Sequence, residues 1–252
     1  MKPKILLFDI ETMANEGYVW GIWEQNVIAI KRPWYMLSFA YKWLGDKKTQ
    51  AYSLPDFKLF KRNRRDDKAL CKELWKLFNK ADVVMAHNGF SFDVKKAQAR
   101  FIKHRFKPTS PFQQIDTLKV AKKYFKFDSN KLDELGKYLG VGQKIVHTGF
   151  DLWLGCAVRN EKKSWNNMVA YNKQDVILLE AVYERMKPYM TDHPNHNVFD
   201  NTKNKCPTCG GIRVIKDGTR ATRTTLQQRM RCMDCGANST KPITKKDNSI
   251  IR

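Results

Sequence analysis

The sequence lacks any long apolar run. None of its stretches reaches the ~20 apolar residues that a membrane-spanning helix needs. The short apolar segment after Met1–Lys4 lacks the longer apolar region of a signal peptide. We therefore predict no membrane association and a cytoplasmic location.

Acidic residues are scarce. The 252 residues include 25 Asp and Glu against 47 Lys and Arg, which gives a formal net charge of +22. Such an excess predicts a polyanionic partner, with nucleic acid as the first candidate. With 42% hydrophobic and 12% aromatic residues, the chain can still bury a sizeable core, which excludes global disorder.

Cysteines are also few, and four of the six form two C-x-x-C pairs. These pairs are Cys206 with Cys209 and Cys232 with Cys235, while Cys71 and Cys156 are isolated. In a reducing compartment this pattern favours metal binding over a disulfide framework. The isolated cysteines are interpreted as buried apolar residues.

The pattern of apolar residues predicts an α/β protein built on a mixed sheet. Strands are expected at 4–8, 34–44, 49–54 and 82–86, and helices at 66–80, 92–104, 116–125, 132–139 and 163–186. The first three strands suggest an antiparallel meander. Residues 16–33 indicate a loop or irregular hairpin near a substrate, and residues 55–65 a basic loop. We divide the chain into a domain at 1–189, a linker at 190–204 and a C-terminal segment at 205–252.

Two carboxylates, Asp9 and Glu11, follow the first apolar run at positions i and i+2. In a strand this spacing places both side chains on one face. Neighbouring anions at the end of a buried strand repel each other unless a cation lies between them, and a divalent metal with oxygen ligands fits. A solvent-exposed strand end would explain the same pair without a metal.

Two further carboxylates occur later in the chain. Asp93 follows an apolar strand where a helix begins, a position at which aspartate alone usually caps the helix. Tyr171 and Asp175 are separated by four residues on the longest predicted helix and share one face. An aspartate beside that apolar seam is costly unless it is paired or bound to metal. A surface tyrosine with a solvated aspartate is the alternative.

Taken together, this order of motifs resembles the DEDD, or DnaQ-like, exonucleases of the RNase H-like superfamily, from about Lys4 to about Tyr189. Tyr171, four residues before the last aspartate, matches the DEDDy branch; the sister branch has histidine where this chain has Ala170. The stretch from Lys131 to Gly140 is also similar to the exonuclease domains of family B DNA polymerases and the YprB-like group.

The resemblance implies an RNase H-like mixed sheet flanked by helices and a metal-dependent 3′→5′ exonuclease. It implies two Mg²⁺ or Mn²⁺ ions: Asp9 bridges both, Glu11 and Asp175 hold the ion that activates water, and Asp93 supports the other. Tyr171 would orient the attacking water. The substrate implied is single-stranded nucleic acid, with DNA favoured, and the product a 5′-mononucleotide. RNA or a structured substrate, or a non-catalytic nucleic-acid-binding adaptor, are the alternatives.

Residues near the motifs are candidates for nucleic-acid binding. These candidates are Thr12, Asn88 and Lys144. His147 in the same loop as Lys144 is a further one, although a solvated loop explains both residues nearly as well. Asp116 is a fifth acid, for which a helix-cap role is favoured.

The two C-x-x-C pairs, each followed by glycine, look like a zinc ribbon with one structural Zn²⁺. A segment this short could not fold on hydrophobic burial alone, so metal would supply its stability. Basic residues between the pairs, among them Arg220 and Arg223, predict contact with a nucleic-acid backbone. Docking of a protein is the alternative, and a replication or repair protein is a further predicted partner.

Overall fold

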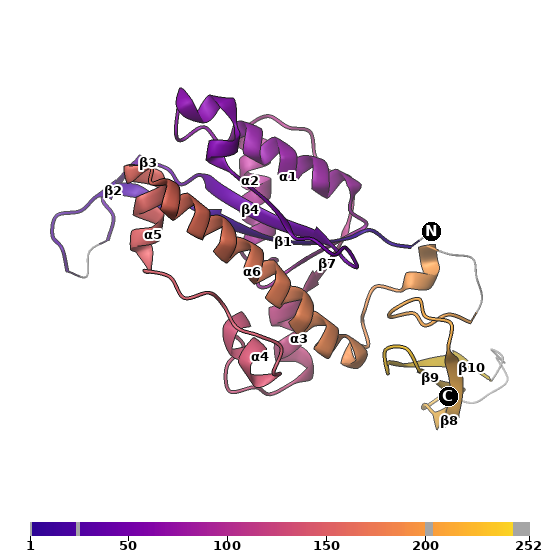
Figure 1. The fold of residues 1–252 in the computed structure, drawn as a ribbon. Coiled ribbons are helices and arrows are strands. Elements are labelled where there is room, and N and C mark those ends of the chain that lie inside the picture. Colours follow the sequence, from indigo (N-terminus) through magenta and orange to yellow (C-terminus); the bar gives the residue numbers. More distant parts are fainter. Residues whose placement is uncertain (1, 24–25, 200–203, 244–252) are drawn as a thin grey trace.

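The computed structural model describes residues 2–23, 26–199 and 204–243. It shows a mixed α/β body followed by a smaller three-stranded module (Figure 1). At the centre of the body is a five-stranded sheet in the order β5-β4-β1-β6-β7. Its strands are β1 (Ile5–Thr12), β4 (Met36–Trp43), β5 (Gln50–Ser53), β6 (Val83–Ala86) and β7 (Gln113–Asp116).

Strand β1 joins the two halves of this sheet. It pairs antiparallel with β4, which pairs antiparallel with β5, so the predicted meander is confirmed. On its other edge β1 is parallel to β6, and β6 is parallel to β7. The sheet is therefore mixed, as the sequence predicted.

Helices cover both faces of the sheet. They are α1 (Lys68–Lys80), α2 (Asp93–Lys103), α3 (Thr117–Tyr124), α4 (Leu132–Tyr138), α5 (Phe150–Leu154) and α6 (Lys162–Met186). The longest, α6, contacts β1, β4 and β5 and runs across one face of the sheet (Figure 1). No helix in the described ranges is both long and apolar enough to cross a membrane.

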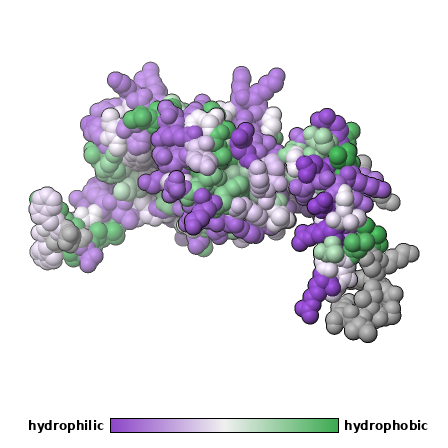
Figure 2. Space-filling view, turned by 90° about the horizontal axis from the view of Figure 1, so that it is seen from below, coloured by the Kyte–Doolittle hydropathy of each residue, from purple (hydrophilic) through white to green (hydrophobic). Residues whose placement is uncertain are grey.

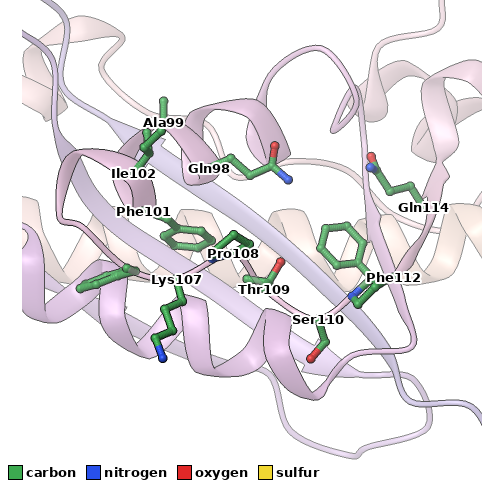
Figure 3. Close-up of a pocket in the computed structure, with 12 residues that line it drawn as sticks. Gln98, Ala99, Phe101, Ile102, Lys107, Pro108, Thr109, Ser110, Phe112 and Gln114 are labelled. Atoms are coloured by element: carbon green, nitrogen blue, oxygen red, sulfur yellow. The ribbon is translucent and has the colours of Figure 1, made fainter.

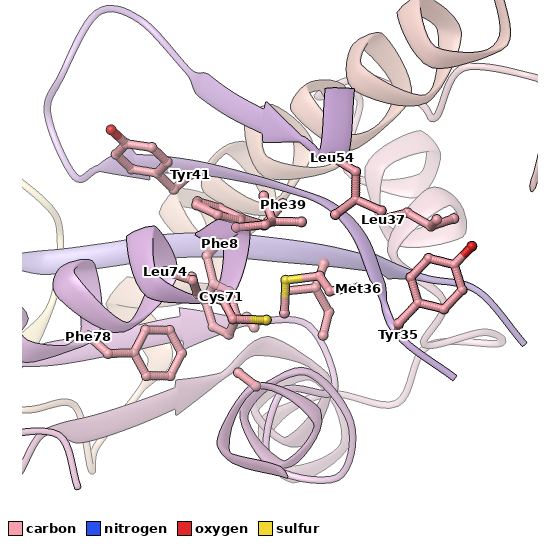
Figure 4. Packing of buried hydrophobic residues seen from close by; sticks show 14 of the residues in the cluster. Phe8, Tyr35, Met36, Leu37, Phe39, Tyr41, Leu54, Cys71, Leu74 and Phe78 are labelled. Atoms are coloured by element: carbon pink, nitrogen blue, oxygen red, sulfur yellow. The ribbon is translucent and has the colours of Figure 1, made fainter. Parts of the chain in front are cut away.

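The side chains of β1 alternate between two hydrophobic cores, one on each face of the sheet. Leu6 and Phe8 belong to the core that α1 and α2 cover, where the rings of Phe8 and Phe78 meet edge to face at 5.0 Å (Figure 4). Ile5 and Leu7 belong to the core that α3, α4 and α6 cover. Burial on both faces explains why this strand reads as a continuous apolar run.

Two segments differ from the prediction. The basic loop at 55–65 is wrong in part, because two 3₁₀ helices, Leu54–Asp56 and Lys58–Lys61, occupy much of it. Strand β7 is missing from the prediction. It is a four-residue edge strand that includes Gln113 and Gln114, so it carries little of the apolar signal of a strand.

Between β1 and β4 the chain forms an irregular hairpin of β2 (Glu16–Tyr18) and β3 (Ala29–Arg32), one of the two forms predicted for 16–33. This hairpin extends from the body at the end opposite the C-terminal module (Figure 1).

The C-terminal module is a sheet in the order β10-β9-β8. Its strands are β8 (Val214–Ala221), β9 (Leu226–Cys232) and β10 (Asn238–Pro242). Its buried hydrophobic cluster consists of Cys206, Cys232 and Ala237, and the partly buried Cys209, Val214 and Cys235 pack against it. This architecture is compatible with the predicted zinc ribbon. The sequence also predicts a basic tail at the end of this segment, and residues 244–252 lie outside the described residues.

Candidate active site

Three of the predicted carboxylates meet beside the centre of the sheet. Asp9 and Glu11 lie on β1, and Asp175 comes from α6, where that helix crosses the strand. One carboxylate oxygen of each lies within 4.8 Å of the other two. Residues far apart in the sequence therefore form one acidic group.

A buried amide fixes this group. Asn172, one turn before Asp175, donates from Nδ2 to Oδ2 of Asp9 at 2.5 Å and to the Asp9 carbonyl at 3.2 Å. Its own Oδ1 accepts a hydrogen bond from the Ser38 hydroxyl on β4 at 3.1 Å. Asn172 thus orients the Asp9 carboxylate and ties α6 to two strands. The sequence prediction missed Asn172, because an asparagine within a helix is usually exposed, and only the structure shows it fully buried beside Asp9.

The fourth carboxylate, Asp93, opens α2 and is buried. Its Oδ1 accepts a hydrogen bond from the backbone N–H of Ile10 at 3.3 Å, between the two acidic residues of β1. Asp93 therefore reaches the same strand, although it is not part of the group of three described above.

Burial and mutual repulsion raise the pKa values of these acids. The pKa of Asp9 lies well above its usual range, first because of burial and then because of Asp93, Glu11 and Asp175. Burial, followed by the charge of Asp175, raises the pKa of Glu11 to about 8. Burial raises the pKa of Asp93 to about 7. Added positive charge would relieve this repulsion.

Part of that positive charge comes from Lys144, in the loop between α4 and α5. Its Nζ lies 2.6 Å from Oδ2 of Asp175 and donates to the Tyr171 hydroxyl at 3.0 Å. Burial opposes the charge of Lys144, but the neighbouring Asp175 outweighs it and raises the pKa of the lysine. Lys144 therefore lies inside the acidic site, not in a solvated loop.

Aromatic rings hold Tyr171 in place. The ring centroid of His147 lies 4.8 Å away and that of Trp153 6.4 Å away, both nearly edge-on. Burial first, and then Asp175, raises the pKa of the Tyr171 hydroxyl. The hydroxyl thus stays protonated near neutral pH and can act as a hydrogen-bond donor.

The donor set fits hard divalent cations. Carboxylate oxygens are the ligands that Mg²⁺ and Mn²⁺ prefer. Oδ1 of Asp175 is buried and has no hydrogen-bond partner among the described residues, so it is available as a ligand. Asp9, Glu11 and Asp175 could hold such an ion.

Asp116 has the helix-cap role that the sequence favoured. Its carboxylate accepts hydrogen bonds from the backbone N–H of Leu118 at 3.0 Å, at the start of α3. It also accepts from the backbone N–H of Asn88 at 2.9 Å, where Asn88 takes a left-handed φ of 66°. The turn after β6 is therefore fixed by Asp116. A contact between Asn88 and substrate stays a prediction.

Thr12 lines a groove of about 490 Å³ that begins beside Glu11. Aromatic side chains and one lysine form much of its remaining wall: Trp34, Phe92, Lys96, Phe150 and Trp153. A larger pocket of about 690 Å³ lies between α2 and the loop before β7 (Figure 3). It contains none of the four carboxylates, and its walls include Phe101, Pro108 and Phe112. The groove beside Glu11, and not the larger pocket, thus belongs to the candidate site.

The four paired cysteines form a second candidate metal site. The Sγ atoms of Cys206 and Cys235, and those of Cys209 and Cys232, lie 3.7 Å apart. Zn–S bonds of about 2.3 Å in a tetrahedron place sulfurs about 3.8 Å apart, so the spacing fits zinc. The backbone N–H of Gly211 points to Cys209 Sγ at 3.3 Å, as expected for a thiolate ligand.

Arg220 and Arg223 are exposed on β8 and in the turn that follows it. In the described part of the chain neither side chain forms an ion pair. The module lies beyond the C-terminal end of α6, whereas α5 lies at the other end of that helix (Figure 1). The structure therefore does not bring these arginines into the carboxylate site.

Comparison with known proteins agrees with this architecture. A family B DNA polymerase from the hyperthermophilic archaeon Pyrobaculum calidifontis is similar in structure, with a TM-score of 0.55 and 15% sequence identity. The similarity covers 74% of this chain but 25% of the polymerase, so this chain spans about a quarter of that protein. It shows a shared fold. Among curated proteins, none matches this sequence. Residues 6–187 match the RNase_H superfamily, and the chain belongs to that superfamily.

Proposed function

We propose that the protein is a metal-dependent 3′→5′ exonuclease of the DEDDy type that degrades single-stranded nucleic acid, with DNA favoured, to 5′-mononucleotides. The observation that carries the proposal is the meeting of Asp9, Glu11 and Asp175, with Tyr171 and Lys144 hydrogen-bonded at the same place. Membership of the RNase_H superfamily supports a nucleic-acid hydrolase.

The four carboxylates would hold two Mg²⁺ or Mn²⁺ ions. Asp9 would contact both, Glu11 and Asp175 one of them, and Asp93 the other. When bound, such ions lower the pKa of water and stabilise the leaving oxygen of a phosphodiester.

Neighbouring side chains would prepare this site. Asn172 holds the Asp9 carboxylate in one orientation, so its ligand oxygens are positioned before any ion arrives. Burial raises the pKa of Tyr171, so the protonated hydroxyl would donate a hydrogen bond to the attacking water and would be a poor general base. Lys144 lies close enough to Asp175 to add positive charge beside the scissile phosphate.

Substrate binding would extend beyond the carboxylates. Thr12, Asn88 and Lys144 would contact the nucleic-acid strand near the carboxylates. Arg220 and Arg223 would bind its phosphate backbone farther from the carboxylates. The net charge of +22 supports a polyanionic substrate. A replication or repair protein remains a proposed partner, and the cytoplasm a proposed location.

We extend the proposal to the organisation of the chain. Residues 1–189 would form the exonuclease domain, 190–204 the linker, and 205–252 a zinc ribbon with one structural Zn²⁺. The separate buried clusters of the body and the module support this division.

The test is a nuclease assay on 5′-labelled single-stranded DNA, single-stranded RNA and duplex DNA, with Mg²⁺, Mn²⁺ or a chelator. We expect a metal-dependent ladder that shortens from the 3′ end and slows by about 100-fold or more in Asp9→Asn. Asp46→Asn, an exposed aspartate after β4, is the matched control and should behave as the wild type. Absence of cleavage on every substrate, with salt-sensitive binding retained, would reject the nuclease and favour a non-catalytic nucleic-acid-binding adaptor.

A further inference from the structure

The hairpin between β1 and β4 carries an unusual set of exposed apolar side chains. Trp20 is 89% exposed and Ile22 86% exposed. Further exposed residues are Tyr18, Val19, Trp23, Val27, Ile28 and Ile30. In the space-filling view the hairpin forms a lobe that stands away from the body (Figure 2). Gathered apolar side chains of this kind usually mark an interaction surface.

The base of the hairpin is part of the groove beside the carboxylates. The groove wall runs through Thr12, Met13 and Asn15, directly after Glu11. Oδ1 of Asn15 accepts a hydrogen bond from the backbone N–H of Trp34 at 2.8 Å and so closes the hairpin. A nucleic-acid strand that leaves the carboxylates along this groove would therefore pass the base of the hairpin.

Positive charge surrounds the same base. The carboxylate of Glu16 lies within 4 Å of Lys31, Arg32 and Arg65, at 3.6, 3.7 and 3.9 Å. Arg65 also donates to the Pro33 carbonyl at 2.9 Å, which places the basic segment 58–65 against the hairpin. One acid thus faces three cations. The partner that fits has negative charge together with flat apolar surfaces.

We infer that the hairpin is a stacking arm, in which Trp20 receives a base of the single strand whose 3′ end lies in the carboxylate site. The inference rests on the proposed function. Stacking of nucleobases on aromatic side chains tolerates any sequence. Phosphates of the same nucleic-acid strand would contact the positively charged residues Lys31, Arg32 and Arg65 where the hairpin joins the body. An acidic membrane surface would also offer charge and apolar groups, but the groove leads from the carboxylates to the hairpin and favours a nucleic-acid strand.

The first measurement is the affinity of the full chain for a labelled single strand of about 12 nucleotides, by fluorescence anisotropy in the Asp9→Asn background, in which cleavage is slowed. Adding Trp20→Ala should weaken binding about tenfold or more, whereas Trp20→Phe should retain most of the affinity. Ile102→Ala, which removes a 78% exposed apolar side chain from α2, is the matched control and should bind like its parent.

The second measurement compares hydrolysis of that oligonucleotide with hydrolysis of a dinucleotide, in chains that keep Asp9. Trp20→Ala should raise KM for the oligonucleotide by a similar factor, leave kcat unchanged and leave dinucleotide hydrolysis unchanged. Equal loss on both substrates would mean that the substitution disturbs the catalytic domain, and it would overturn the inference.

Two other results would overturn it while leaving the proposed function intact. One is unchanged oligonucleotide binding in Trp20→Ala alongside an active wild type. The other is that the wild type binds acidic phospholipid vesicles and Trp20→Ala loses this binding, while its nucleic-acid binding is retained. Failure of the wild type to cleave either substrate would instead reject the proposed function, and the anisotropy measurement would still decide the role of Trp20.

Discussion

The carboxylate site and the cysteine site are both candidate metal centres, but the structure around each is stabilised differently. The carboxylates lie on β1, α2 and α6, and apolar side chains of these elements form the two hydrophobic cores of the body, which need no ion. The cysteines belong to a module whose buried cluster contains two of those same cysteines and Ala237. The fold of the body positions the carboxylates without metal, whereas the fold of the module would depend on metal binding by the cysteines. Metal removal should therefore unfold the module but leave the fold of the body intact.

The largest effect is expected from Cys206→Ser. Structural zinc sites in small domains contribute about 10–16 kcal/mol of apparent binding free energy, and the module has little else to stabilise it. We expect the substituted chain to lose zinc and the structure of β8–β10 while the body keeps its melting temperature. Elemental analysis and amide hydrogen exchange would measure this. If the amides of β8–β10 remained protected from exchange without metal, the module would not depend on metal for its structure.

Phe8→Ala should have the converse effect. The ring is fully buried against Phe78, so its removal should lower the free energy of unfolding of the body by about 3–5 kcal/mol. Urea denaturation would measure the loss, and zinc content should stay unchanged. Ile177→Ala, on an exposed position of α6, is the control and should cost far less. A fall in zinc content with Phe8→Ala would show that the module depends on the core.

The lowered pKa of Asp67 makes the stability of the body depend on pH in the acidic range. Burial tends to raise the pKa of Asp67, but hydrogen bonds from His104 and Arg100 outweigh it and lower the pKa to about 2. With an unfolded value of ~3.9, this difference contributes about 2.5 kcal/mol of stability above pH 4, which disappears as the pH falls through 2. The stability difference between wild type and Asp67→Asn should therefore shrink between pH 5 and pH 2 in urea titrations. A constant difference would contradict this assignment.

The smallest effect is expected from Ser38→Ala. It removes the hydrogen bond to Asn172, which should lower the free energy of unfolding by about 1 kcal/mol. Because Asn172 orients Asp9, cleavage should also slow, while zinc content stays constant. Unchanged cleavage with lower stability would restrict Ser38 to a structural role.

The sequence predicted those features whose signal is local. The apolar run of β1, the spacing of Asp9 and Glu11 and the two C-x-x-C pairs can each be read from a few adjacent residues. The position of Lys144 could not, because its contact with Asp175 depends on how the loop before α5 folds back across α6. Asn172 was equally hidden, since an asparagine inside a helix gives no sign that it will be buried against β1.

Exposure was a second limit. The sequence predicted a loop or irregular hairpin at 16–33, but it did not predict that so many apolar side chains of the β2–β3 hairpin would be exposed to solvent. Local pattern separates apolar from polar residues but cannot tell which apolar residues the rest of the chain will cover.

Binding of Mn²⁺ tests the independence of the two centres most directly. Electron paramagnetic resonance would count bound Mn²⁺ in the wild type, Asp9→Asn and Cys206→Ser after removal of exchangeable metal. The expected result is Mn²⁺ binding in the wild type and in Cys206→Ser, with loss of it in Asp9→Asn. Equal Mn²⁺ binding in Asp9→Asn and the wild type would contradict the assignment of the carboxylates as the catalytic metal site.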